Sequence, residues 1–286
     1  MLVAVVEEFA LEERLLPWGT TPLEPLEPER SRLREWLAAG FHGGLDYLPR
    51  TAEARGDPTH PGILRAGARG AIILALPYAR GPFPPDPDGN RPAGYVRGRN
   101  YHSVFRGVLR RLAGRLRSAV PGIALRPFCD ALPVMEKALA VRAGLGWQGR
   151  NTLVLHPQHG STFVLGGLLT DRELPAGAPI PPGCGECRRC IDACPTGALR
   201  LPGLLDADRC LSRWTTRKLA PPPGLPRGPY TLGCDVCQDA CPFNAGPGPE
   251  PYRGFYQRTT SDPGSSATSG SPAAGSSPSS SPPKSV

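Results

Sequence analysis

Residues 184–195 read CGECRRCIDACP, which places four cysteines at C-x2-C-x2-C-x3-C-P spacing: Cys184, Cys187, Cys190 and Cys194. A second set follows in residues 210–241, and its last three members repeat the C-x2-C-x3-C-P spacing: Cys210, Cys234, Cys237 and Cys241. Eight of the nine cysteines of the chain therefore fall into two matching sets. Cys129 stands outside both.

This double spacing is typical of bacterial ferredoxins, in which thiolates hold two [4Fe–4S] clusters and the fourth cysteine of each run ligates the other cluster. The spacing therefore predicts one cluster on Cys184, Cys187, Cys190 and Cys241. It predicts a second on Cys194, Cys210, Cys234 and Cys237. Structural zinc is an alternative, but zinc sites usually combine paired C-x2-C arms. Disulfides would suit a secreted chain, and a lone Cys129 fits a small buried side chain.

The charge balance favours an anionic partner. Lys and Arg number 33 against 25 Asp and Glu, a net charge of +8, which suits nucleic acid, although arginine-rich composition alone also gives basic proteins that bind none. No apolar run is long enough to span a membrane. The first 16 residues carry four glutamates and no basic n-region, so they do not resemble a signal peptide. Together with iron–sulfur thiolates, this predicts a cytoplasmic protein.

Apolar segments and helical patterns alternate before residue 175. Residues 28–40 have the spacing of an amphipathic helix that stops at Gly40, and the apolar residues 71–76, ended by Pro77, fit a buried strand. Loops are expected at 43–47 and 81–93. Further strands are expected at 123–128, 152–155 and 162–169, with a turn at Gly160, and a further helix at 133–144.

An amphipathic helix is also expected between residues 104 and 116. Apolar residues recur there at helical spacing: Val104, Val108, Leu109, Leu112 and Leu116. Basic residues lie between them: Arg106, Arg110, Arg111, Arg115 and Arg117. This basic face is either a solvated surface or a contact for nucleic acid.

Strands that alternate with helices indicate an α/β domain. Because a ferredoxin-like cluster domain follows it, the expected fold class of the whole chain is α+β. Residues 1–175 form the α/β domain, and residues 176–256 form a ferredoxin-like domain with two [4Fe–4S] clusters, its motifs running from about residue 183 to 244. Residues 257–286 are almost entirely Ser, Pro, Gly, Ala and Thr. Such a segment buries too little apolar surface to offset its ordering entropy, which predicts a disordered tail.

Further motifs stand in a fixed order before the cysteines. Residues 126–136 read RPFCDALPVME and residues 143–151 read AGLGWQGRN; Gly160-Ser161 and Leu165-Gly166 follow, and the second cysteine run lies inside GCDVCQ at 233–238. In this order they resemble the epoxyqueuosine reductase family, over about residues 43–244. Members of that family use cobalamin and iron–sulfur clusters for the last change to queuosine in tRNA.

The resemblance implies that the chain reduces epoxyqueuosine in tRNA, with electrons passing from an external donor through both clusters to cobalamin. It makes Asp130 the proton donor. Reduction of an epoxide to an alkene takes two electrons and two protons, so this carboxyl group would need a raised pKa. Apolar surroundings would raise it; the candidates are Phe128, Leu132, Pro133 and Trp147. Without the resemblance, Asp130 fits a helix N-cap or a turn residue.

The resemblance also places the cobalamin site in the α/β domain, with contacts at Asp130, Val154, Ser161 and Leu165. It adds two contacts from the cluster domain, Ser212 and Asp235. The chain departs from the family at Asn100, where an acidic residue is usual, and at Lys137 and Arg150, which exchange Arg and Lys. The tail stands where the family commonly has a helical-repeat extension, which puts tRNA affinity in doubt more than the chemistry.

Three other functions are considered. A reductive dehalogenase shares both cofactors but commonly has a twin-arginine leader and a tyrosine donor. A two-cluster electron-transfer protein, or an RNA-binding module with a structural cluster, needs no Asp130 motif. The sequence from Cys184 to Arg227 contains eight basic residues and four acidic residues. That excess either neutralises the clusters or, through Arg213, Arg217 and Lys218, meets tRNA phosphates.

Overall fold

The apolar run at residues 71–76 lies in the central strand of a four-stranded sheet. The computed structural model describes residues 1–80, 85, 87–246 and 248–256. Strand β2 (Gly70–Pro77) is buried along its whole length. The sheet order is β1 (Trp18–Pro22), β2, β7 (Phe163–Thr170) and β4 (Leu125–Phe128), and all three pairings are antiparallel.

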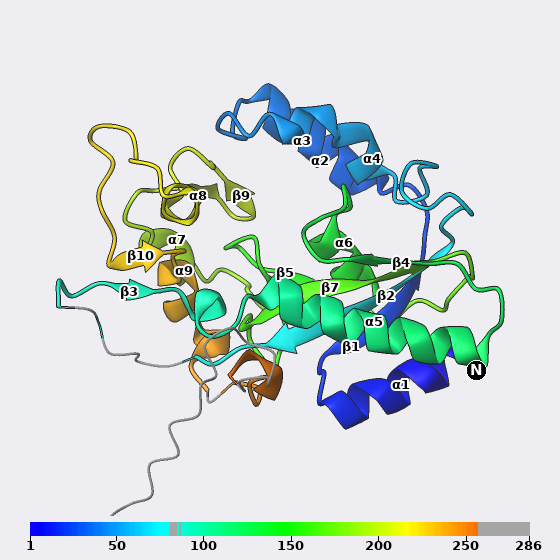
Figure 1. Cartoon of the computed structure of the whole chain (residues 1–286). Coiled ribbons are helices and arrows are strands. Elements are labelled where there is room, and N and C mark those ends of the chain that lie inside the picture. Colours follow the sequence, from blue (N-terminus) through cyan, green and yellow to red (C-terminus); the bar gives the residue numbers. More distant parts are fainter. Residues whose placement is uncertain (81–84, 86, 247, 257–286) are drawn as a thin grey trace, which may run out of the picture. The chain divides into compact units, whose positions relative to one another are not determined.

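Strand β2 is apolar throughout because helices cover both faces of the sheet (Figure 1). Its residues Ile72, Leu74 and Leu76 pack against α1 (Leu2–Glu13) and α5 (Tyr101–Ala119). The alternate residues Ala71, Ile73 and Ala75 pack on the face covered by α6 (Glu136–Arg142). A half-buried strand would alternate apolar and polar residues, whereas a strand buried on both sides reads as one apolar run.

The expected alternation of strands and helices is present, but it forms a split βαβ unit. Helix α5 connects β2 to β4, and these two strands run parallel because both are antiparallel to β7, which lies between them. Close packing permits the insertion, since a Cβ on Gly166 of β7 would lie 2.8 Å from Phe105 of α5. The α+β class is confirmed, whereas the parallel pairing typical of α/β sheets does not occur within this sheet.

Helix α5 matches the amphipathic helix expected from the sequence. Asn100 caps it, its Oδ1 accepting from the His102 N–H at 3.0 Å. The predicted apolar stripe is buried. On the basic face, Arg111 and Arg115 are paired with Glu13 and Glu12 of α1. Part of that face therefore binds a neighbouring helix, and the exposed remainder consists of Arg106, Arg110 and Arg117.

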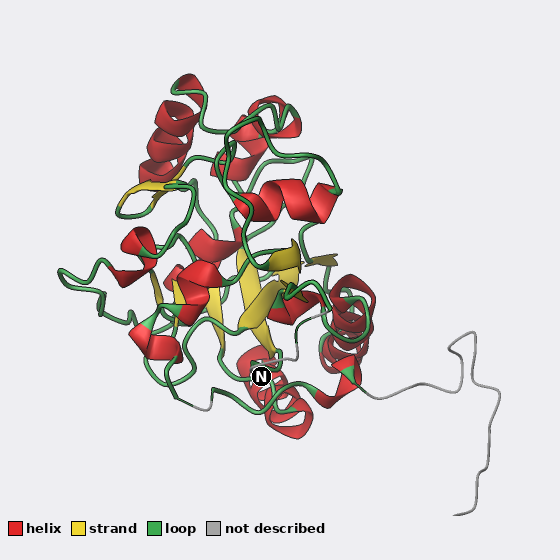
Figure 2. Cartoon of the chain, turned by 90° about the vertical axis from the view of Figure 1, so that its left-hand side faces the viewer, coloured by secondary structure: helices red, strands yellow, loops and turns green. Residues whose placement is uncertain are grey.

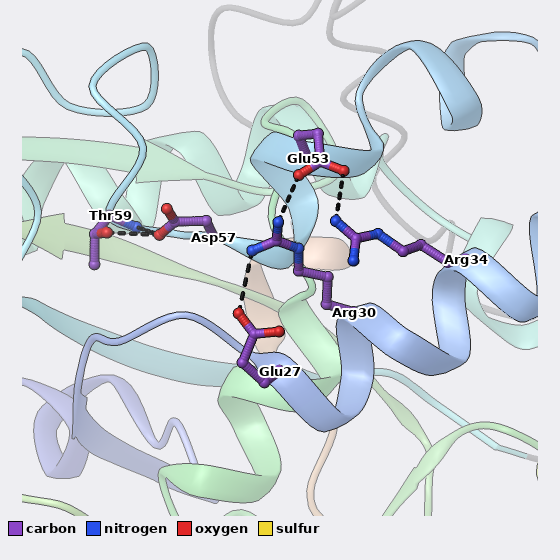
Figure 3. A network of polar contacts seen from close by, with 6 residues as sticks. All are labelled: Glu27, Arg30, Arg34, Glu53, Asp57 and Thr59. Atoms are coloured by element: carbon purple, nitrogen blue, oxygen red, sulfur yellow. Dashed lines mark hydrogen bonds and ion pairs between the residues drawn. The ribbon is translucent and has the colours of Figure 1, made fainter.

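Helices α2 (Glu27–Ala38), α3 (Tyr47–Arg50) and α4 (Ala52–Gly56) form a small helical group, in which ion pairs join α2 to α4 (Figure 3). Arg30 reaches Glu27 at 3.1 Å and Glu53 at 2.8 Å, and Arg34 reaches Glu53 at 3.0 Å. Exposed pairs of this kind stabilise by about 0–1 kcal/mol each. Closer packing occurs at Gly56, where a Cβ would lie 2.6 Å from the Arg30 side chain.

The cysteine-rich part has only short elements (Figure 2). Its helices are α7 (Arg189–Asp192), α8 (Leu211–Arg217) and α9 (Val236–Asp239), with the 3-10 turns η2 (Pro242–Asn244) and η3 (Arg253–Phe255). Strands β8 (Leu199–Leu201) and β9 (Leu204–Leu205) pair, as do β5 (Trp147–Gln148) and β6 (Val154–Leu155). β10 (Tyr230–Leu232) pairs with β3 (Arg91–Pro92), beside η1 (Gly94–Val96).

Residues Met1–Tyr256 form one compact unit, with α2 tied to the cysteine-rich part by a 2.6 Å bond from the Trp36 indole N–H to the Leu205 carbonyl. The helix expected at 133–144 begins later, at Glu136. Helix α1 and strand β1 had no counterpart in the prediction. The tail expected at 257–286 and most of the first half of the loop expected at 81–93 lie outside the described residues.

Candidate functional site

Four cysteines line one pocket, and they are the four that the spacing assigns to the first cluster: Cys184, Cys187, Cys190 and Cys241. The pocket is open, and its empty space, part of it open solvent, is about 290 Å³. Three of the thiols come from the loop around α7, and Cys241 comes from the end of α9. Residues more than 50 positions apart are thus brought together. The ferredoxin pattern requires this, because the last cysteine of one run ligates the cluster held by the other run.

The other four thiols also lie close enough to affect one another's ionisation. Burial, together with the neighbouring Cys210 and Cys194, raises the pKa of Cys234 to about 11. Burial likewise raises the pKa of Cys237, which is near Cys190 of the first set. Electrostatic repulsion among adjacent thiolates favours ligation by a metal, which keeps thiols deprotonated. The structure thus brings each predicted set together and places the two sets next to each other.

Cys194 differs from its partners because hydrogen bonds surround its sulfur. The Ala198 N–H donates to its Sγ at 3.3 Å, and the Thr196 hydroxyl lies 3.6 Å away. Burial opposes ionisation, but these bonds outweigh it and lower the pKa of the thiol. Sulfur that accepts hydrogen bonds is a general feature of iron–sulfur sites. A donor set of thiols with such support fits [4Fe–4S] clusters.

Asp130 lies in the loop that follows β4, in the left-handed backbone region (φ 57°). Its carboxylate accepts a hydrogen bond from the Tyr101 hydroxyl and lies 3.8 Å from His102 Nδ1. Its backbone N–H donates to Glu136 Oε1 at 2.7 Å. Contacts from α5 and α6 therefore hold a strained loop in one conformation, which is a frequent feature of functional sites.

The apolar enclosure expected around Asp130 is wrong, since the side chain is 52% exposed. Phe128 packs in the core, and Trp147 packs instead against Phe243 near Cys184. The more enclosed acid is the neighbouring half-buried Glu136, whose pKa is raised to about 8 by partial burial and by the Asp130 charge. Glu136 stands inside the quoted motif, but the sequence did not distinguish it as a titrating group.

Three of the predicted cobalamin contacts surround η1. Tyr95 of η1 has its ring 6.0 Å from the ring of Tyr101, edge to face, and its side chain lies close to Ser212. The carboxylate of Asp235 accepts from the Gly94 N–H at 2.6 Å. The 3-10 turn therefore connects the Asp130 loop with Ser212 and Asp235, which flank the second cysteine set. Tyr95 was not identified from the sequence, because nothing local marks it.

The other three predicted contacts have their side chains turned inward. Val154 is buried in the core, and Leu165 is half-buried against it. Ser161 is buried, and its Oγ donates to Gln238 at 3.0 Å while its N–H donates to Asn244 at 2.8 Å. Gly160 before it has no room for a side chain, because a Cβ would lie 2.0 Å from Asn244 Oδ1. The Gly-Ser motif thus fixes a buried hydrogen-bond network.

The basic residues after the first cysteine run are not equally available. Arg213 is 14% exposed; it pairs with Asp208 at 2.6 Å and stacks over the Trp214 ring. Arg213 is therefore a structural residue, and its expected role at a phosphate is wrong. Arg217 and Lys218 at the end of α8 are exposed.

Among the described residues, no helix is long and apolar enough to cross a membrane.

Comparison with known proteins agrees with both parts of the chain. Residues 183–244 match a domain described as "4Fe-4S double cluster binding domain", and residues 59–131 match "Epoxyqueuosine reductase QueG, DUF1730". The chain is 38% identical to an epoxyqueuosine reductase from Pseudomonas aeruginosa over 91% of this chain and 74% of the relative. It is 37% identical to one from Aliivibrio fischeri over 77% of this chain.

A solved structure of epoxyqueuosine reductase with an epoxyqueuosine-modified tRNA-Tyr stem loop is also similar, with a TM-score of 0.76 and 28% identity over 87% of this chain and 67% of that one. The chain spans 60% of the Aliivibrio fischeri relative and 66% of one from Vibrio cholerae. The two matched domains include Asp130 and all eight cysteines of the two sets.

Proposed function

Since this chain belongs to the epoxyqueuosine reductase family, we propose that it reduces the epoxide of epoxyqueuosine in tRNA to the alkene of queuosine. The observation that carries this proposal is the pocket in which Cys241 joins the first three cysteines. It agrees with the exchange of ligands between two [4Fe–4S] clusters. The substrate is taken from the relative that was solved with a modified stem loop.

We assign one cluster to Cys184, Cys187, Cys190 and Cys241, and the other to Cys194, Cys210, Cys234 and Cys237. When bound, the two clusters and cobalamin supply the two electrons of the reduction, taken from an external donor. For cobalamin, the exposed Asp130 and the half-buried Ser212 and Asp235 are open to a ligand. Val154, Ser161 and Leu165 stay predictions, and any contact there would have to involve mainly backbone atoms.

The residues around Asp130 supply the protons. Loss of the epoxide oxygen as water consumes two protons with the two electrons. Asp130 is placed to relay a proton from solvent, because its carboxyl group is exposed and the Tyr101 hydroxyl orients it. Burial, and to a lesser degree the Asp130 charge, raises the pKa of Tyr101. The Tyr101 hydroxyl therefore stays protonated and remains a hydrogen-bond donor. Glu136 stays largely protonated at neutral pH and therefore adds little negative charge beside Asp130.

The tRNA is held, in this proposal, by exposed cations near the second cysteine set. Arg217 and Lys218 are exposed at the end of α8, which begins next to Cys210 and carries Ser212. Phosphate contacts of this kind position the nucleic acid without reading its sequence. A tRNA substrate also makes the cytoplasm the expected location.

The test is turnover of a defined substrate. Protein reconstituted anaerobically with iron, sulfide and cobalamin is incubated with reductant and a stem loop that carries epoxyqueuosine, and the nucleoside is analysed by mass spectrometry. The proposal expects loss of one oxygen and formation of queuosine. Full iron and sulfide content without cobalamin binding or conversion would instead favour a two-cluster electron-transfer protein.

A further inference from the structure

The turn between β5 and β6 borders the first cysteine pocket. Arg150 and Asn151 of this turn line the pocket together with the four cysteines. The turn is tight, with the Gly149 N–H donating to the Leu153 carbonyl at 2.8 Å and the Thr152 N–H to the Gly149 carbonyl at 2.9 Å. A well-defined backbone therefore carries polar side chains to the edge of the thiol cluster.

Asn151 has a buried side-chain NH2 group with no hydrogen-bond partner among the described residues. The side chain is 3% exposed. Its Oδ1 accepts from the Leu153 N–H at 3.2 Å, which fixes the orientation of the amide, while Nδ2 is buried without a hydrogen bond. Buried donors without an acceptor are rare in folded proteins. Because Asn151 and the four cysteines line the same pocket, sulfur atoms there are the candidate acceptors for this donor.

A second donor approaches the same group of thiols. The Trp147 indole N–H donates to Cys184 Sγ at 3.3 Å. The ring is held edge to face against Phe243, with centroids 4.9 Å apart. It also lies against Gly183, where a Cβ would be 2.9 Å from the indole. Packing on two sides leaves the indole N–H directed at the sulfur.

We propose that Asn151 and Trp147 are positioning residues for the cluster bound at Cys184, donating hydrogen bonds to its sulfur atoms and raising its reduction potential. This inference rests on the cluster assignment of the proposed function. The reduced cluster carries one more negative charge than the oxidised cluster, so N–H donors stabilise the reduced form more. Outer hydrogen bonds of this kind tune metal sites in general.

The test is a redox titration of the holoprotein with dithionite, followed by electron paramagnetic resonance, after iron and sulfide content has been verified. Asn151→Ser keeps an acceptor for the Leu153 N–H but is too short to bring a donor to the pocket. Trp147→Phe keeps the aromatic packing and removes the N–H. Each variant should lower the potential of one cluster so that its reduction constant falls about threefold, or about 28 mV at 59 mV per tenfold.

Thr196→Val is the matched control, since it removes a hydroxyl near Cys194 and should leave the Cys184 cluster unchanged. Unchanged potentials in both Asn151→Ser and Trp147→Phe, at full iron content, would overturn the inference and leave the cluster assignment intact. If Asn151→Ser does not fold, Trp147→Phe still decides whether donors at this pocket set the potential. A wild-type protein without two clusters would refute the proposed function before any variant is compared.

Discussion

The sheet and the cysteine segment, residues 184–242, are stabilised in different ways. Eight consecutive residues of β2 are buried between helices on two faces. In the cysteine segment, α7 and α9 have four residues each and its strands have two or three. Helices and hairpins this short are marginal alone. Packing stabilises the sheet, whereas we expect metal ligation to stabilise the cysteine segment.

Removal of iron should separate the two regions most clearly. Metal binding contributes directly to the folding free energy of small metal sites. In chelated protein, we expect trypsin to cut the cysteine segment at least about tenfold faster, at Arg188, Arg189 or Arg200, while the sheet stays resistant. Mass spectrometry of the fragments measures both rates. Equal resistance in the metal-free and metal-bound forms would show that packing alone holds the segment.

The Asp130 loop lies between the sheet and the cysteine segment. A substitution of Asp130 therefore tests whether the place where these regions meet is catalytic. Asp130→Asn keeps the size of the side chain but removes the transferable proton. Turnover should fall by roughly a hundredfold or more, while iron and cobalamin content stay near wild type. Asp46→Asn, on an exposed residue at the start of α3, is the matched control. Turnover near wild type in Asp130→Asn would mean that another group gives the proton.

Loss of the exposed cations of the cysteine segment should affect only the binding of tRNA. Arg217→Ala with Lys218→Ala should weaken stem-loop binding and lower its log–log salt slope by about two, at roughly one per lost phosphate contact. Turnover of the free nucleoside should not change. Arg32→Ala, on the surface of α2, is the control. If the free nucleoside and the tRNA lose activity equally, the two cations serve the clusters or the fold.

Glu136 should have the smallest effect, and it belongs to the packed region. Its pKa of about 8 in the folded protein is above the ordinary 4.5. As pH rises above about 4.5, the unfolded chain releases this proton first, so stability falls until pH passes about 8. Glu136→Gln should remove this decline and raise the Tm by a few degrees at pH 8, but not at pH 4. If Glu136→Gln changed the Tm by the same amount at pH 4 and at pH 8, the assigned pKa of Glu136 would be contradicted.

Local patterns predicted the parts of the molecule that depend on local sequence. The cysteine spacing predicted both thiol sets, a continuous apolar run predicted β2, and apolar residues at helical spacing predicted α5. It did not predict that β7 enters between β2 and β4, because pairing partners depend on contacts far apart in the chain. Helix α1 has an apolar face at Val6, Phe9 and Ala10 that could have been found.

The candidate site was harder to predict than the fold. Tyr101 meets Asp130 from another element, and Tyr95 reaches Ser212 across more than 100 residues, so neither leaves a local signal. Arg213 was expected at the surface because its charge suggests exposure, yet Asp208 and Trp214 hold it inside. The resemblance singled out Asp130, which lies in an exposed, strained loop, but the apolar residues expected around it pack elsewhere.

The number of irons per chain in three proteins tests the two-cluster assignment most directly. Anaerobically reconstituted wild type should hold about eight irons and eight sulfides, from four per cluster. Cys190→Ser should hold about four, and Cys129→Ser, outside both sets, should hold about eight. About two irons in the wild type, zinc in place of iron, or loss of iron in Cys129→Ser would contradict the two-cluster assignment.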